Sequence, residues 1–177
     1  MRRPSSSQSP LTSIALIGLG VLLVVAGYSI YTTLWGPARV AAEVGARAPD
    51  FTVRDLEGDE VHLSDYRGRP VLLNFRTTWC GYCRQEATEL QAAHESIPEL
   101  VILGVYVDES AAEVAAYRAA AGLTFPSLLD PGGETALLYG VHGIPRSFFL
   151  DAGGVITVEH TGPLTVGRIQ SYLSQGR

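Results

Sequence analysis

The sequence predicts an α/β domain, in which helices cover both faces of a mixed central sheet, preceded by one transmembrane helix. Two patterns support this prediction. After residue 49, short apolar runs that suit strands alternate with runs of helical period, as expected for crossover connections onto a shared sheet. Before residue 49, a long uncharged stretch suits a membrane span. We therefore expect a single folded domain behind an anchor.

The uncharged stretch is long enough to cross a bilayer. No charged residue lies between Pro4 and Ala38, and residues 11–35 exceed the roughly 20 helical residues that a hydrocarbon core of about 30 Å requires. We expect a short tail over residues 1–10 and an anchor over residues 11–35. The alternative is a cleaved signal peptide, since Val40-Ala41-Ala42 resembles a cleavage site, but apolar signal segments run only about 7 to 15 residues.

The flanks of this span predict its orientation. Arg2 and Arg3 precede it, and positive charge favours the cytoplasmic side. Tyr28, Tyr31 and Trp35 gather at its end, where aromatic rings prefer the headgroup layer. We expect a single-pass protein of the cell membrane, with a cytoplasmic N-terminus and an extracytoplasmic C-terminal domain.

The folded domain is expected over residues 49–177, after a tether over residues 36–48 that is rich in Ala, Gly and Pro. We expect the domain to begin with a β-hairpin. Apolar and polar residues alternate over 51–55 and 61–63, on either side of the turn-forming Glu57-Gly58-Asp59. The elements that follow are expected as strand 71–76, a helix from Cys83 to Ile97, strand 100–107, helix 110–121, strand 125–129, helix 134–139, strands 146–150 and 155–159 around a turn at 151–154, and helix 166–175.

Composition excludes several functions. The net charge is −5 and no basic cluster follows Arg2 and Arg3, so the positive stripe that nucleic acid requires is missing. The sequence contains no Lys, which excludes Schiff-base chemistry and a Walker-type phosphate loop. Cys80 and Cys83 are its only cysteines, so a framework of several disulfides cannot hold the fold together.

The two cysteines predict redox chemistry. Cys80-Gly81-Tyr82-Cys83 lies between a buried strand and a helix, where unpaired N–H groups and the helix dipole favour a thiolate at Cys80. Cys83 lies within disulfide reach, so it can resolve a mixed disulfide that Cys80 forms. The alternatives are a structural disulfide, which a four-residue loop makes weak, and half of a zinc site.

Three segments resemble a known family. Leu73-Asn74-Phe75, the run from Trp79 to Glu86 and Gly143-Ile144-Pro145 resemble the membrane-anchored thioredoxin-like proteins of the TlpA and ResA kind, over residues 49–177. The resemblance implies a thioredoxin-like fold and an extracytoplasmic dithiol reductant without a cofactor. Its partners would be protein disulfides or dithiols, apocytochrome c among them, and a membrane electron donor that reduces it again.

The same resemblance assigns further site residues. Pro145 would be a cis-proline facing the cysteines, and its backbone and that of Ile144 would bind an extended substrate, with Trp79 beside them. The alternative for Pro145 is an ordinary trans proline in a turn. Asn74 stands where thioredoxin has a buried acid, so Glu86 is expected to exchange a proton with Cys83. Its place on the helical row of Cys83 and Leu90 should bury it and raise its pKa, unless it reaches solvent or pairs with an Arg at the edge of that face.

Three residues depart from the family's pattern. Arg76 stands where an aromatic is usual, Tyr82 where Pro is usual, and Arg146 where Thr usually follows the cis-proline. The two cations would favour a thiolate at Cys80 if they reached it. For Arg76 we expect a solvated position at the end of its strand.

Three other functions remain open. A disulfide-forming oxidase would use the same two cysteines, since the motif leaves the redox potential open. A peroxiredoxin-like peroxidase would match Thr77, but Leu73 occupies the position where Pro is needed. A copper carrier would use Cys80, Cys83 and His142, although the wider cysteine spacing of such carriers is missing. The favoured function needs no metal.

Overall fold

The computed structural model describes residues 10–35 and 42–176, with side chains described from residue 18 to 31 in the first of these ranges. Residues 1–39 and 40–177 form two separate units, of which the second contains the whole sheet. The predicted tail up to residue 9 and the predicted tether from residue 36 to 41 lie outside the described residues.

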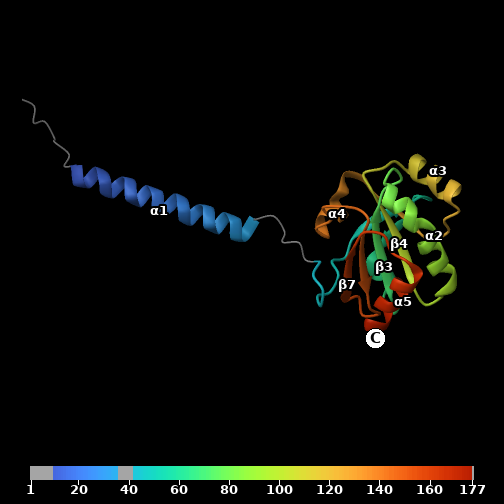
Figure 1. Ribbon diagram of the computed structural model, residues 1–177. Coiled ribbons are helices and arrows are strands. Elements are labelled where there is room, and N and C mark those ends of the chain that lie inside the picture. Colours follow the sequence, from blue (N-terminus) through green and yellow to red (C-terminus); the bar gives the residue numbers. More distant parts are fainter. Residues whose placement is uncertain (1–9, 36–41, 177) are drawn as a thin grey trace, which may run out of the picture. The chain divides into compact units, whose positions relative to one another are not determined.

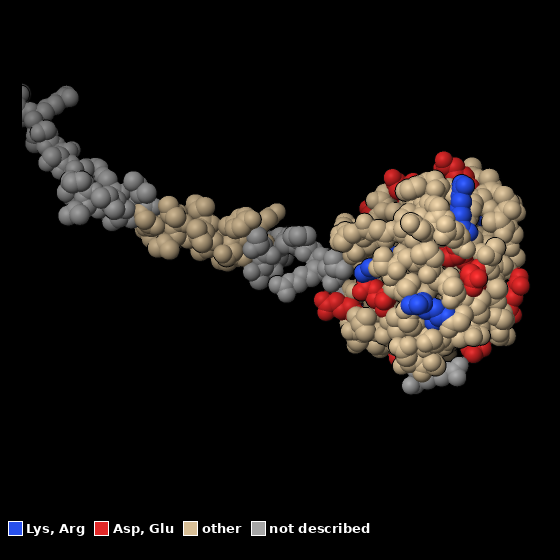
Figure 2. All heavy atoms as spheres, viewed as in Figure 1, with Lys and Arg blue, Asp and Glu red and all other residues tan. Residues whose placement is uncertain are grey.

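The described part of the first unit is one helix, α1 (Pro10–Trp35). Its described side chains are all exposed, and the part drawn in tan in Figure 2 has no charged side chain. Within the part of the chain that the structure describes, no helix is both long enough and apolar enough to cross a membrane.

The second unit is an α/β domain with one mixed sheet of seven strands in the order β2-β1-β5-β4-β3-β6-β7 (Figure 1). β4 lies parallel to both β3 and β5, and the other pairs are antiparallel. The mixed sheet and the expected order of strands and helices are confirmed. The strands are β1 (Thr52–Asp55), β2 (Glu60–His62), β3 (Val71–Arg76), β4 (Val101–Val107), β5 (Ser127–Asp130), β6 (Arg146–Leu150) and β7 (Ile156–Thr161).

Helices cover both faces of this sheet, as expected. One apolar core joins alternate residues of β3 to α4, and the other joins the opposite face of the sheet to α2, α3 and α5 (Figure 1). Both faces of β3 are therefore buried, which explains why its sequence does not alternate between apolar and polar residues, and why even Asn74 and Arg76 are buried. The helices are α2 (Gly81–Ser96), α3 (Ala111–Ala121), α4 (Glu134–Leu138) and α5 (Val166–Gln175), with two short 3-10 turns, η1 (Leu63–Tyr66) and η2 (Pro131–Gly133).

Local signals explain most of the element boundaries. Ser110 and Glu113 form a capping box at the start of α3, and Gly122 ends that helix in the left-handed conformation. β5 starts two residues later than expected, because Pro126 has no N–H for the ladder and only its carbonyl accepts, from Gly104 N.

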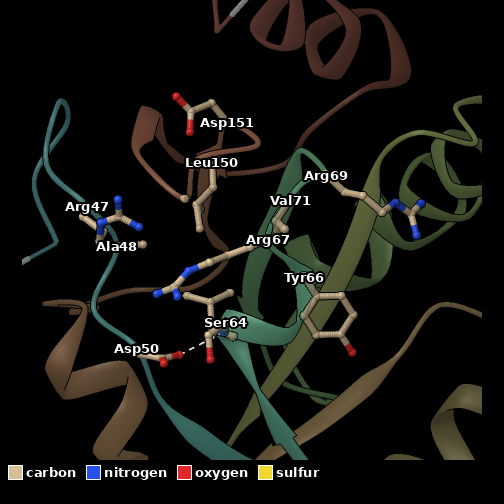
Figure 3. A pocket seen from close by; sticks show the side chains of 12 residues that line it. Arg47, Ala48, Asp50, Ser64, Tyr66, Arg67, Arg69, Val71, Leu150 and Asp151 are labelled. Carbon is tan, nitrogen blue, oxygen red and sulfur yellow. Dashed lines mark hydrogen bonds between the residues drawn. The ribbon is translucent and has the colours of Figure 1, made fainter.

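The domain begins earlier than the sequence composition suggests. Residues 42–48, assigned above to the tether, pack on the turn between β6 and β7: Gly45 N donates to Ile156 O at 2.8 Å, and Arg47 forms a bridge with Val155. Figure 3 shows the adjoining pocket, where Asp50 accepts a hydrogen bond from Ser64 N at 3.0 Å. Small residues resemble a linker in sequence, but here they allow the backbone to lie close against the sheet.

We predict that Tyr139→Phe lowers the free energy of unfolding by about 1 kcal/mol, because Tyr139 Oη donates to Pro49 O at 2.6 Å and the buried ring keeps its packing. Urea denaturation of the full-length chain would measure this as a lower midpoint with an unchanged slope. Tyr82→Phe is the matched control, since that ring is exposed. Equal midpoints for the two variants would contradict the role given to the Tyr139 hydroxyl.

Candidate active site

The two cysteines lie where β3 ends and α2 begins, as expected. Cys80 is the N-cap of α2, and its Sγ accepts a hydrogen bond from Cys83 N at 3.2 Å. Both are free thiols. Cys80 retains 7% exposure whereas Cys83 is fully buried, so only the first sulfur can meet a partner from outside.

The Cys83 thiol is strongly biased toward its protonated form. Burial, followed by the hydrogen bond with Cys80, raises the pKa of Cys83 from 9.0 to about 12. Cys80 Sγ lies at the positive end of the helix, and Cys83 lies beneath it. This arrangement suits a two-step disulfide exchange, because Cys80 can attack while Cys83 keeps its proton.

The loop before Cys80 is held from two sides. Thr78 N donates to a carboxylate oxygen of Glu109 at 2.9 Å, and Thr78 Oγ1 donates to the same carboxylate. On the other side, Arg84 Nε donates to Thr78 O at 2.7 Å. Sequence reasoning missed both contacts. The available signal was that Glu109 lies two residues after a buried parallel strand, at the edge of the sheet where Cys80 also lies.

A second loop faces Cys80. The Ile144-Pro145 peptide bond is cis, as the family resemblance implies, and Ile144 O lies 4.0 Å from Cys80 Sγ. Trp79 and Tyr82 flank the cysteine in sequence and are 70% and 62% exposed. An exposed apolar surface of this kind beside a reactive sulfur suits contact with a polypeptide.

Glu86 is buried beneath the cysteines, which confirms its expected position. It is 1% exposed, its Oε1 accepts from Asn74 Nδ2 at 3.0 Å, and its Oε2 accepts from Leu164 N at 3.1 Å. Burial raises the pKa of Glu86, while the hydrogen bond from Asn74 and the charge of Arg76 counteract part of that rise. Its role in proton transfer stays a prediction.

The expectation for Arg76 is wrong. Its side chain is fully buried rather than solvated, because α2 and α3 cover this end of β3, and its guanidinium lies over aromatic rings. Neither Arg76 nor Arg146 is directed at the Cys80 thiol by the contacts that they make: Arg76 bonds to Cys83 O, and Arg146 pairs with Glu159 on β7.

His142 is exposed on the loop before the cis-proline. Among the described residues, no group of three or more His, Cys, Asp and Glu side chains is placed to hold a metal, so His142 does not complete a three-ligand site with the cysteines.

The chain is similar to a known protein family and to proteins named thiol-disulfide oxidoreductases. Residues 44–159 match the AhpC/TSA family. The chain is 37% identical over 155 residues to the thiol-disulfide oxidoreductase ResA of Geobacillus kaustophilus, covering 86% of this chain and 88% of that protein. It is 32% identical over 163 residues to ResA of Bacillus subtilis, covering 89% and 90%.

Solved structures share the architecture. The crystal structure of StoA from Bacillus subtilis matches with a TM-score of 0.63 at 27% identity, over 73% of this chain and 98% of that one. A thiol:disulfide interchange protein from a Bacteroides species, solved in solution, matches with a TM-score of 0.68 at 22% identity, over 76% and 90%. The second likeness concerns the fold alone.

We predict that iodoacetamide at pH 8 labels Cys80 in the reduced full-length chain and leaves Cys83 unlabelled. A pKa of about 12 instead of 9.0 lowers the thiolate fraction of Cys83 about a thousandfold. Mass spectrometry of the labelled peptides would measure both rates, with Cys80→Ser and Cys83→Ser as single-thiol controls. Labelling of Cys83 should rise with pH up to about 12. Equal rates at pH 8 would show that Cys83 is not protected.

Proposed function

Because the chain belongs to the AhpC/TSA family and is a thiol-disulfide oxidoreductase with a thioredoxin-like fold, we propose that Cys80 and Cys83 are its redox-active pair and reduce protein disulfides outside the cytoplasm. The observation that carries the proposal is the unequal placement of the two sulfurs. Cys80 caps α2 and retains some exposure, whereas Cys83 is fully buried, and burial raises the pKa of its thiol.

The proposed reaction has two exchanges. The Cys80 thiolate attacks one sulfur of a substrate disulfide, which forms a mixed disulfide and releases the other sulfur as a thiolate that takes a proton. Cys83 then loses its proton and attacks Cys80 Sγ, which breaks the mixed disulfide, releases the second substrate thiol and leaves a Cys80–Cys83 disulfide. The substrate gains two electrons and the protein loses two. An oxidase would run the same steps backwards.

Glu86 is the proposed acceptor of the Cys83 proton. The carboxylate lies one helical turn after Cys83 on the buried face of α2, and burial raises its pKa above the ordinary value of a Glu. Asn74 holds the carboxylate in place but cannot titrate. Proton exchange between two neighbouring buried groups avoids leaving a charge alone in the core.

The site that receives the substrate is proposed to be the exposed Trp79 together with the Ile144-Pro145 backbone. Extended polypeptides bind through backbone hydrogen bonds, and Ile144 O is the acceptor nearest to Cys80 Sγ among its contacts. The proposed substrates are protein disulfides, with apocytochrome c among them as the family resemblance implies, and a membrane dithiol donor would reduce the pair again.

The proposed location is the cell membrane, with residues 11–35 as a single-pass anchor and the N-terminal tail in the cytoplasm. The sequence supports this, since residues 4–38 are uncharged and Arg2 and Arg3 precede them.

We predict that Cys80→Ser abolishes insulin reduction by the full-length chain. Cys83→Ser should still attack and then stall as a mixed disulfide, because only this change removes the resolving thiol. Non-reducing electrophoresis with mass spectrometry would detect the trapped species. If Cys83→Ser turned over as wild type does, Cys83 would have no resolving role.

We predict that Glu86→Gln slows dithiol exchange and changes its pH dependence, since an amide keeps the shape but cannot accept the proton. Glu89→Gln is the matched control, because Glu89 also accepts a backbone N–H next to α5, from Val166 at 2.8 Å. The measurement is the pH profile of insulin reduction. Identical profiles for Glu86→Gln and wild type would leave the proton acceptor unidentified.

We predict that reporter domains fused after Gly45 are active only outside the cytoplasm, and that the mature chain keeps its first 35 residues. The internal control is a pair of reporters, one active only in the cytoplasm and the other active only outside it. Sequencing of the mature N-terminus would decide the second point, and a start near Glu43 would replace the anchor by a cleaved signal peptide.

A further inference from the structure

The domain buries a cation directly beneath the cysteine pair. Arg76 is fully buried, and it makes no ion pair among the described residues. A charge in a low-dielectric core is costly unless other groups stabilise it. A buried arginine at this place therefore calls for a physical explanation.

Aromatic rings surround the guanidinium. Its central carbon lies 5.6 Å from the ring centre of Tyr106 on β4, 5.8 Å from that of Tyr117 on α3, and 5.9 Å from that of Phe125. Cation–π attraction of this kind is strongest where water is excluded. Nη2 donates to Tyr117 Oη at 3.2 Å, whereas Nε and Nη1 have no hydrogen-bond partner in the described structure.

The same guanidinium reaches the active-site helix. Nη2 donates to Cys83 O at 2.9 Å. Two residues earlier on the same face of β3, Asn74 Nδ2 donates to Glu86 Oε1 at 3.0 Å. Arg76 and Asn74 lie about 7 Å apart on β3. They thus hold two residues of α2 that are one turn apart, Cys83 and Glu86.

We propose that Arg76 is a positioning residue of the dithiol site, which ties Cys83 to β3 and supplies the fixed positive charge that allows buried Glu86 to be negative. The proposal rests on the function proposed above, because it concerns the residue proposed there to accept the Cys83 proton. Arg76 lies on the face of β3 that α2 covers, as Asn74 does. The hydrogen bond from Asn74, followed by the charge of Arg76, lowers the pKa of Glu86 against the effect of burial.

The other groups around this pair do not replace Arg76. The titratable neighbours are Cys83 on α2, Tyr106 on β4 and Tyr117 on α3. Burial raises the pKa of Cys83 and of Tyr106, so neither carries a charge at pH 7. From β6, Ser147 Oγ contacts Asn74, and from the segment before α5 the N–H of Leu164 contacts Glu86. Arg76 is the cation whose charge acts on Glu86.

The test measures the ionisation of Glu86 directly. Carbon-13 NMR of the Glu86 carboxyl group in the full-length chain, in detergent micelles, would give its pKa. In Arg76→Met, a neutral side chain of similar length, we expect that pKa to rise by about one unit or more. The pH profile of insulin reduction should move to higher pH by the same amount, because Glu86 stays protonated longer.

Tyr117→Phe is the matched control, because it removes one of the two acceptors of Arg76 Nη2 but leaves the cation. It should leave the Glu86 pKa at the wild-type value. An unchanged pKa in Arg76→Met would overturn the proposal, and so would a shift in Tyr117→Phe as large as that in Arg76→Met, since packing would then be the cause.

A measurement on wild type covers the case in which Arg76→Met does not fold. The nitrogen-15 shift of Arg76 Nε should change with the same midpoint as the Glu86 carboxyl group, and a flat titration would overturn the proposal. If the proposed function were wrong, the wild-type chain would form no reversible Cys80–Cys83 disulfide. That result is separate from the NMR titration, which would still show whether Arg76 lowers the pKa of Glu86.

Discussion

The interaction on which this site depends is the hydrogen bond from Cys83 N to Cys80 Sγ at the start of α2. A helix leaves its first N–H groups without partners, and the N-cap side chain normally supplies an oxygen for one of them. Here a sulfur takes that place. The same contact directs the sulfur toward the positive end of the helix and draws Cys83 beneath it, so helix capping and the proposed chemistry use one atom.

Beneath that cap lies a polar layer between β3 and α2. Asn74, Arg76 and Glu86 are almost completely buried, although each could have been an apolar residue of similar size. Buried polar groups are costly unless they are paired, and hydrogen bonds across the strand and the helix pair each of these residues in part. Asn74 Oδ1 and the Nε and Nη1 atoms of Arg76 have no hydrogen-bond partner in the described structure. Such a layer explains why the sheet end below the cysteines is polar while both flanking cores are apolar.

Much of this arrangement follows from local sequence patterns. Apolar periodicity predicts every named strand and α-helix of the domain in order, and the position of Cys80 between β3 and α2 follows from it. The burial of Arg76 could not be predicted, because it depends on α3, which lies far away in sequence and covers the end of β3. The clamp of Glu109 on Thr78 was missed for a similar reason, since it joins the ends of two neighbouring strands.

The early start of the domain has a mechanical consequence. Residues 42–48 enter along the turn between β6 and β7, beside the first residue of β3, whereas the cysteines follow the last. Six strand residues, about 20 Å, separate these two poles. Under the anchoring proposed above, a pull on residue 42 would act on the hairpin of β6 and β7 rather than on the dithiol.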